Sequence, residues 1–305
     1  MNWSLLPQQL VIGIQLGAVY ALIALGYTMV YGVLRFINFA HGDVYMVGAY
    51  LSYYTSMRWF DRTSMNPYFL LLVMLFISML GCALLGLAVE RLAYRPLRNA
   101  PKIAVLITAI GVSLFIEYGG KFFFKTSPKP SISQDVNVFS KPVNFAGITV
   151  DLSQLTVLGV TLVLMGLLWY FVTHTGTGRA MRAVSHDFGA ASLMGVNVNK
   201  VVAITFGIGS ALAGAGGMMN STAMGTPLDP FYGLMPGVKA FVAAVVGGIG
   251  NIPGAVVGGL IMGVMETLIV WLGYGGYKDA VAFVLLIIIL HIRPSGLCGS
   301  SLEKV

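Results

Sequence analysis

The sequence predicts an all-α polytopic membrane protein of about eight transmembrane segments, some of them broken or re-entrant. Hydrophobic residues make up 57% of the 305 residues and charged residues only 10%, whereas a soluble domain carries roughly a quarter charged residues. Mean hydropathy is +0.84, and the chain contains several apolar runs of the length, about 20 residues, that crosses a bilayer. Lys and Arg lie in the connections between these runs, so the net charge of +7 indicates membrane orientation and not nucleic-acid binding.

The first half of the chain alternates apolar runs with polar connections. The run from about Leu10 to Leu34 predicts a span and lacks the basic leader and cleavage site of a signal peptide. From Arg35 to Tyr54 polar residues interrupt the apolar pattern, which predicts a broken helix or a helix that faces a protein-lined cavity. Further spans are expected at about 67–89, 103–124 and 152–173.

Two of the connections indicate the sides of the membrane. The connection 90–102 carries Arg91, Arg95, Arg98 and Lys102 against one acid, which predicts a cytoplasmic location. The connection from about 125 to 151 is rich in Pro, Ser and Asn and predicts an external loop. Alternating apolar residues at 136–150 predict a small hairpin within it.

Glycine and proline become frequent beyond Lys200. Small residues spaced by four, such as Gly207 with Ala211 and Gly254 with Gly258, predict helices in close contact. Prolines divide this part of the chain and leave residues 238–246 as a piece too short to cross, which predicts a re-entrant segment or half-helix. The last spans are expected at about 255–272 and 280–292. The prolines are Pro227, Pro230, Pro236 and Pro253.

The segment 178–200, GRAMRAVSHDFGAASLMGVNVNK, is a basic interruption between two membrane-length runs. Its apolar residues recur at helical spacing and are expected to line one side of a short helix that stops at Gly195. One interpretation is a helix presented to a soluble partner in the cytoplasm. The alternative is an ordinary charged loop that follows the positive-inside rule. The apolar residues are Ala183, Ala190, Ala191, Leu193 and Met194.

The sequence contains no motif of an enzyme or a nucleotide site. No G-x-x-x-x-G-K-[ST] phosphate loop occurs, the four histidines have no metal-ligand spacing, and no serine lies in a nucleophile elbow. Cys82 and Cys298 fit neither a disulfide framework nor a metal site. We therefore expect no catalytic residue, metal or cofactor, and no ATPase site in this chain.

Polar residues within the apolar runs are the candidates for a transport path. Asn38, His41 and Asp43 cluster at the predicted break, and Glu117 and Glu266 are second candidates, because polar groups are costly in hydrocarbon and tend to face a bundle interior or a water-filled path. The alternative is that they cap broken helices or pair with one another across the bundle. A stand-alone ion-coupled secondary transporter would also use such acids, as ion or proton relays.

Five long passages of the sequence carry a family resemblance: ALIALGYTMVYGVLRFINFAHGDVYMVGAY, ERLAYRPLRNAPK, GRAMRAVSHDFGAASLMGVNVNKVVAITFGIGSALAGAGG, MPGVKAFVAAVVGGIGNIPGAVVGGLIMG and LHIRPSGLCG. In that order they resemble the LivH-type permease of branched-chain amino acid ABC importers. The resemblance covers nearly the whole chain and is weakest across residues 121–151. It implies an ABC importer permease built as one transmembrane domain over residues 1–305, with an external loop at about 125–151 and a cytoplasmic coupling loop at about 174–200.

The same resemblance implies a subunit of the bacterial inner membrane that moves leucine, isoleucine or valine into the cytoplasm. Its expected partners are a second related permease chain in a heterodimer, two cytoplasmic ABC ATPase subunits, a periplasmic amino acid binding protein and membrane lipid. No nucleic acid is expected. An ABC permease for urea or short amides has the same architecture and stays open as an alternative.

Within the coupling loop, the resemblance implies an ATPase contact. The family pattern is an acidic residue, two small residues and a later glycine, and His186 stands where relatives often carry glutamate. This departure affects the charge pairing with the ATPase and not the docking itself. The residues assigned to the contact are Arg179, Arg182, Ser185, His186, Asp187, Ala190, Ala191 and Gly195.

Overall fold

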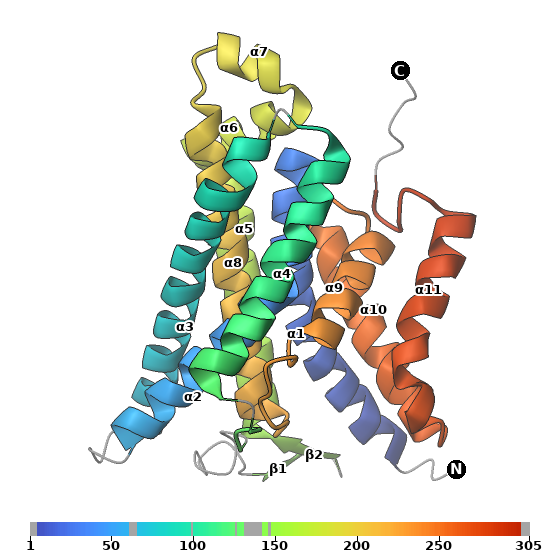
Figure 1. Cartoon of the computed structure of the whole chain (residues 1–305). Helices are drawn as coiled ribbons and strands as arrows, with labels where there is room; N and C mark the ends of the chain where they lie inside the picture. Colours follow the sequence, from blue (N-terminus) through green and yellow to red (C-terminus); the bar gives the residue numbers. More distant parts are fainter. Residues whose placement is uncertain are drawn as a thin grey trace.

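The computed structural model describes residues 5–60, 66–98, 100–125, 127–130, 142–145 and 148–299, and all structural statements below refer to them. The chain forms a bundle of long helices (Figure 1). Helix α7 projects at one end, and the β1–β2 hairpin and the N-terminus lie at the other; we call these the α7 end and the hairpin end. The elements are α1 (Leu6–Leu34), α2 (His41–Phe60), α3 (Pro67–Val89), η2 (Glu90–Tyr94), η3 (Arg95–Leu97), α4 (Lys102–Phe124), β1 (Pro142–Phe145), β2 (Ile148–Asp151), α5 (Leu152–His174), α6 (Gly176–His186), α7 (Phe188–Leu193), α8 (Val198–Ala223), α9 (Leu234–Gly247), α10 (Ile252–Trp271), η5 (Gly275–Tyr277) and α11 (Lys278–Ile292).

Seven helices of the described part are long and apolar enough to cross a membrane. They contain α1, α3, α4, α5, α8, α10 and α11. Helix α2 has 20 residues but is more polar, and α9 has only 14 residues, which span about 21 Å of a hydrocarbon layer of roughly 30 Å. The all-α membrane fold is therefore confirmed, and the expected eight segments approximate these seven spans with two interior helices.

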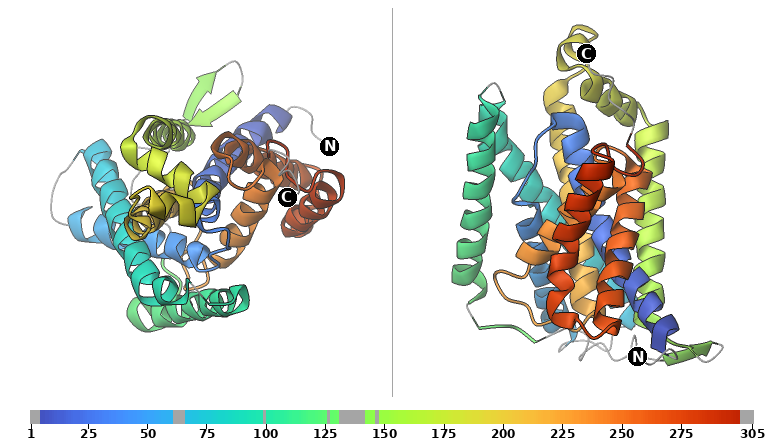
Figure 2. Two further views of the ribbon diagram at one scale, coloured as in Figure 1. Left: turned by 90° about the horizontal axis from the view of Figure 1, so that it is seen from above. Right: turned by 90° about the vertical axis from the view of Figure 1, so that its right-hand side faces the viewer.

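Helix α1 is the central element of the bundle. Nearly every residue from Gly17 to Val30 is buried, and α1 packs against α8, α9 and α10. Small residues permit the contact with α10: a Cβ added at Gly263 would lie 2.2 Å from the backbone nitrogen of Gly17. In contrast, α4 and α11 lie at the margins of the bundle with α9 between them (Figure 2), and their outer faces are exposed and apolar, as lipid-facing helices require.

The predicted break after α1 is confirmed. Arg35 has a left-handed backbone with φ 54 and ends α1; residues 35–40, which we call the linker, are not helical except for a turn at 39–40. Helix α2 then begins at His41 inside the bundle. Its first turn meets the first turn of α9, where a Cβ on Gly42 would lie 2.6 Å from the carbonyl oxygen of Gly233. Two helix starts thus come together within the bundle.

In the second half of the chain, some prolines and glycines have other roles than the sequence predicted. Pro236 and Pro253 do not end helices but lie in the first turns of α9 and α10, where the missing amide hydrogen has no helical partner to lose. Close contact at Gly254 and Gly258 is confirmed, since a Cβ on Gly258 would lie 2.0 Å from the carbonyl oxygen of Ala243. Gly207 instead faces only the side chain of Leu87.

Two further connections are more regular than predicted. The cation-rich connection after α3 continues as the π-helical η2 and the 3-10 helix η3 before it turns. At the hairpin end, β1 and β2 pair antiparallel, which confirms the expected hairpin for its described residues; positions 136–141 lie outside them.

Candidate functional site

The linker and the first turn of α2 hold the three first candidates for the transport path, each fixed by a different neighbour. Asn38 is 3% exposed, and its Oδ1 accepts a hydrogen bond of 2.6 Å from the hydroxyl of Tyr94 in η2. The backbone nitrogen of His41 bonds the carbonyl oxygen of Asn38 at 3.2 Å. Asn38 therefore joins the linker to η2 and supports the start of α2.

His41 faces the opposite way, toward α1. Its Nε2 lies 3.2 Å from the carbonyl oxygen of Ile23, and its ring lies 4.5 Å from that of Tyr27. Gly26 leaves the space for this ring, because a Cβ at Gly26 would lie 2.3 Å from Nε2. The imidazole is thus packed against a bare stretch of α1 backbone.

Asp43 faces α4, where the structure brings it together with Glu117. Its Oδ2 accepts a hydrogen bond of 2.5 Å from Ser113, and the carboxyl group of Glu117, one turn further along α4, is near enough to interact with that of Asp43. Both acids are buried. One turn further along α4, the Nζ of Lys121 lies 4.5 Å from the ring centre of Phe231. A polar strip therefore runs between α2 and α4 at the margin of the bundle.

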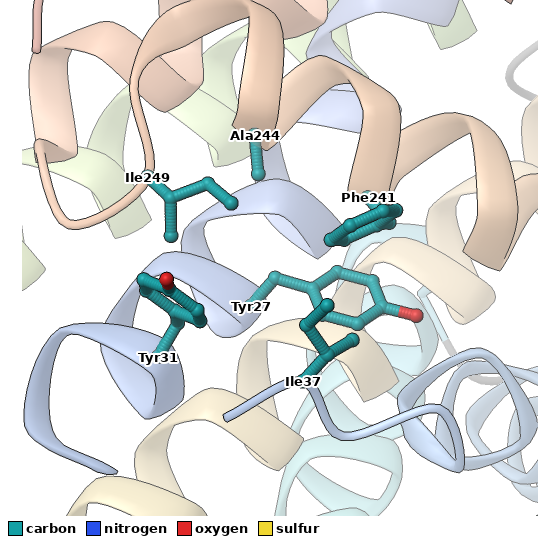
Figure 3. Close-up of a pocket in the computed structure, with 6 residues that line it drawn as sticks. All are labelled: Tyr27, Tyr31, Ile37, Phe241, Ala244 and Ile249. Carbon is teal, nitrogen blue, oxygen red and sulfur yellow. The ribbon is translucent and has the colours of Figure 1, made fainter. Parts of the chain in front are cut away.

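A small crevice lies beside the linker, between α1 and α9 (Figure 3). Its walls are apolar and aromatic, and Tyr27 contacts both Phe241 in the crevice and His41 in the break. Aliphatic walls next to polar groups are what a ligand with a charged head and an apolar side chain requires. The lining residues are Tyr27, Tyr31, Ile37, Phe241, Ala244 and Ile249.

Glu266 does not join this group, because it belongs to a separate ion-pair cluster of α1, α9, α10 and α11. Its Oε1 accepts from the Nζ of Lys239 at 2.8 Å, and its Oε2 accepts from the hydroxyl of Tyr20 at 2.8 Å. Lys239 also pairs with Asp279 at 2.6 Å. For Glu266, the geometry therefore matches the alternative interpretation, pairing across the bundle.

The segment 176–195 is two helices and not one. Asp187 separates them: its backbone is extended, and its Oδ1 accepts from the backbone nitrogen of Ala190 at 2.9 Å, which caps the start of α7. Gly195, with φ +82, stops α7 as expected, and the amide of Val196 bonds back to the carbonyl of Ala191, the usual glycine-ended helix terminus.

The split places the predicted apolar face in two environments. Helix α6 buries Met181 and Val184 against the bundle, and of α7 only Ala191 is buried. Leu193 and Met194 are 90% and 84% exposed. The expectation of one continuous apolar side is therefore wrong, and α7 offers its large apolar residues to the outside.

Of the other predicted residues of this loop, two form hydrogen bonds to backbone carbonyl groups and two are exposed. Arg182 donates to the carbonyl oxygens of Val172 and Thr173 at the end of α5. Ser185 donates its hydroxyl to the carbonyl of Arg182, whereas the side chains of Arg179 and His186 are exposed.

Sequence reasoning did not single out three residues that join this region together. Arg35 reaches the carbonyl of Ser185 across 150 positions of sequence, Tyr94 bonds Asn38, and Ser113 bonds Asp43. Only proximity in the fold relates them. The sequence pointed to two of these residues only indirectly. Arg35 is the first residue of the polar interruption, and Tyr94 lies in the passage ERLAYRPLRNAPK, which carries part of the family resemblance.

A bundle of membrane-length helices with a polar break inside and a projecting helical loop at one end is typical of a membrane permease. Sequence comparison supplies the family. The profile described as "Branched-chain amino acid transport system / permease component" matches residues 9–290, and the chain belongs to this family.

Individual relatives agree with this assignment. The high-affinity branched-chain amino acid transport system permease protein LivH of Escherichia coli K12 is 40% identical over 98% of this chain and 97% of its own. BraD of Pseudomonas aeruginosa, a protein of the same description, is 39% identical over the same shares. The ribose import permease protein RbsC of Escherichia coli K12 is 30% identical over only 40% of each chain. The inner-membrane location expected from the sequence follows from this family.

Proposed function

We propose that this chain is the permease subunit of an ABC importer that moves leucine, isoleucine or valine into the cytoplasm. One observation carries the proposal: relatives named for branched-chain amino acid transport match from end to end, whereas the ribose permease matches over less than half of the chain. ATP hydrolysis takes place on two separate ATPase subunits. A second, related permease completes a heterodimer, and a periplasmic binding protein delivers the amino acid.

The charges at the two ends support an orientation with the α7 end in the cytoplasm. The connections at the α7 end carry many cations and, in the described part, only Glu90 and Asp187 as acids, which fits the positive-inside rule. At the hairpin end, cations and acids such as Lys129 and Asp229 are mixed. The cations of the α7 end are Arg35, Arg91, Arg95, Arg98, Lys102, Arg179, Arg182, Lys200 and Arg293.

Helix α7 is the proposed contact with the ATPase. Large apolar side chains at a protein surface mark interaction sites when they cluster. Leu193 and the neighbouring Met194 are such side chains, because both are almost fully exposed. The loop is firmly held on the bundle through Arg182 and the buried residues of α6. It can therefore transmit a displacement imposed from outside, as a rigid element does.

The proposed path runs along the polar break. The ammonium group of an amino acid pairs with a carboxylate, and Asp43 with Glu117 is the buried acidic pair that is not neutralised by a salt bridge in the described structure. The branched side chain needs apolar walls, which the crevice of Tyr27 and Phe241 offers. Weak, transient binding suffices because the binding protein supplies selectivity.

The test is reconstitution of the chain in proteoliposomes with its ATPases, partner permease and binding protein. We expect leucine uptake that needs ATP, persists when ion gradients are collapsed, and is inhibited by isoleucine and valine. Uptake that survives without ATP but fails without an ion gradient would instead indicate a secondary transporter. Uptake of urea or acetamide in place of leucine would assign the cargo of the alternative permeases.

Replacing Asp43 by alanine is expected to lower leucine uptake by about 10- to 100-fold, the effect of losing one charge-assisted hydrogen bond of about 1.5–3 kcal/mol. Asp43→Asn keeps the size of the side chain and an acceptor for Ser113 but removes the charge. Both variants should still bind the ATPases in pull-down. Wild-type uptake by Asp43→Asn would show that the charge is not part of the path.

A further inference from the structure

The linker contacts the α6–α7 loop through its first residue. The Nη2 of Arg35 donates to the carbonyl oxygen of Ser185 at 3.2 Å. Ser185 lies in the last turn of α6, where carbonyl groups lack helical partners and the helix dipole is negative, so that a guanidinium is well placed. The left-handed backbone of Arg35, unusual for a residue with a side chain, lies at the point where α1 turns into the linker.

The linker contacts η2 through two further residues. The ring of Phe36 lies 5.1 Å from that of Tyr94, and the Tyr94 hydroxyl bonds Asn38 at 2.6 Å. The Tyr94 ring also lies 5.3 Å from that of Phe206 in α8. Tyr94 is 2% exposed, so this aromatic group is fixed on both sides. A π-helical turn such as η2 within a long helix is often found at functional sites.

The chain that follows α7 is attached to η2 as well, through the first turn of α8. Arg98 pairs with the buried carboxylate of Glu90 in η2 and donates to Oδ1 of Asn199, in the first turn of α8, at 2.5 Å. The loop is therefore held before α7 by Arg35 and after α7 by Arg98. Both attachments lead to the linker or to η2, which contact each other through Tyr94.

We propose that Arg35 and Tyr94 are positioning residues that pass movement of the α6–α7 loop to the first turn of α2. The inference rests on the proposed function, and it assigns residues to the coupling step that the contact motif of the loop does not contain. Arg35 is bonded to the last turn of α6 and would move with it. Tyr94 bonds the side chain of Asn38, and the carbonyl oxygen of Asn38 accepts a hydrogen bond from the backbone nitrogen of His41. A displacement of α6 then reaches His41 and Asp43 through a linker of six residues.

The test measures leucine uptake and ATP hydrolysis together in the reconstituted complex. Arg35→Gln and Tyr94→Phe are each expected to lower the leucine taken up per ATP hydrolysed by about tenfold, the scale of coupling lost with one strong hydrogen bond. ATP hydrolysis and co-purification of the ATPases should be unchanged. Since the two residues act in series, the double variant should be no worse than the more severe single variant.

Arg95→Gln is the matched control. Arg95 is an exposed arginine at the same end, and its guanidinium bonds no other residue of the described structure, so the same loss of charge should leave the ratio of uptake to hydrolysis unaltered. An unaltered ratio in Arg35→Gln, loss of ATPase binding by it, or additive effects in the double variant would each overturn the inference. Absence of ATP-driven uptake by the unaltered complex would overturn the proposed function itself, and the inference with it.

Discussion

Replacing Lys239 by methionine is expected to lower the free energy of unfolding by about 3–5 kcal/mol, the usual cost of leaving one partner of a buried ion pair alone. Lys239 lies in α9, the short interior helix, and binds Glu266 at 2.8 Å and Asp279 at 2.6 Å. The side chains of Lys239 and Glu266 are each only 6% exposed. Methionine has a similar volume but no charge, so the buried carboxyl group of Glu266 would be left with only the hydroxyl of Tyr20 as a partner.

The measurement is thermal or denaturant unfolding of the purified protein in one detergent, wild type against variant. The double variant Lys239→Met with Glu266→Gln removes both charges and should recover most of the loss, because the cost arises from the unpaired carboxylate. Asp279→Asn is the matched control: its side chain is 44% exposed, and pairs of that kind contribute only about 0–1 kcal/mol. An equal loss in all three variants would show that shape, and not charge, is what matters.

The membrane spans could be predicted from the sequence because the bilayer imposes their length and composition. The prediction for residues 67–89 coincides with α3, and the other spans that were predicted with bounds differ by a few residues at their ends. No bounds were predicted for α8, which lies in the glycine-rich part of the chain. The break after Leu34 was also predictable, since Asn38, His41 and Asp43 are too polar for a lipid-facing helix. These features depend on the local sequence and the solvent alone.

The partners of the polar residues could not be predicted in the same way. Asn38, His41 and Asp43 lie within six positions, yet they bond η2, α1 and α4 respectively. Glu266 was a path candidate in sequence, but the fold pairs it with Lys239. Whether a buried acid such as Glu266 or Asp43 has a cationic partner depends on helices distant in sequence, and no local pattern encodes that partner.

Asp187 shows the intermediate case, where a local signal existed but periodicity concealed it. Apolar residues on both sides continue at helical spacing, which predicted one helix. Asp is a strong N-cap residue, however, and in the structure its side chain caps α7 and breaks the helix at that point. The break turns α7 away from α6 and leaves Leu193 exposed, so it determines which residues an ATPase would meet.

Replacing Leu193 by aspartate is expected to weaken binding of the ATPase subunits on the order of 100-fold and to abolish ATP-driven leucine uptake. Leu193 is 90% exposed and Met194 84%, more than any other large apolar residue of the described structure. Truncating a central apolar anchor of an interface costs about 2–4 kcal/mol, which is a factor of roughly 30 to 900 in affinity. A carboxylate adds a desolvation cost. The measurement is pull-down of the ATPases with uptake in proteoliposomes.

The control for this variant is Leu92→Asp, which places the same carboxylate on a leucine of η2 that is 77% exposed at the same end. Because Leu92 lies outside α7, this change should leave ATPase binding intact. Leu193 is 90% exposed and contributes little buried surface to the fold, so Leu193→Asp should also insert and melt like the wild type. If both variants bound the ATPases as the wild type does, the contact would lie elsewhere on the α7 end, and the exposed residues of α7 would require another partner.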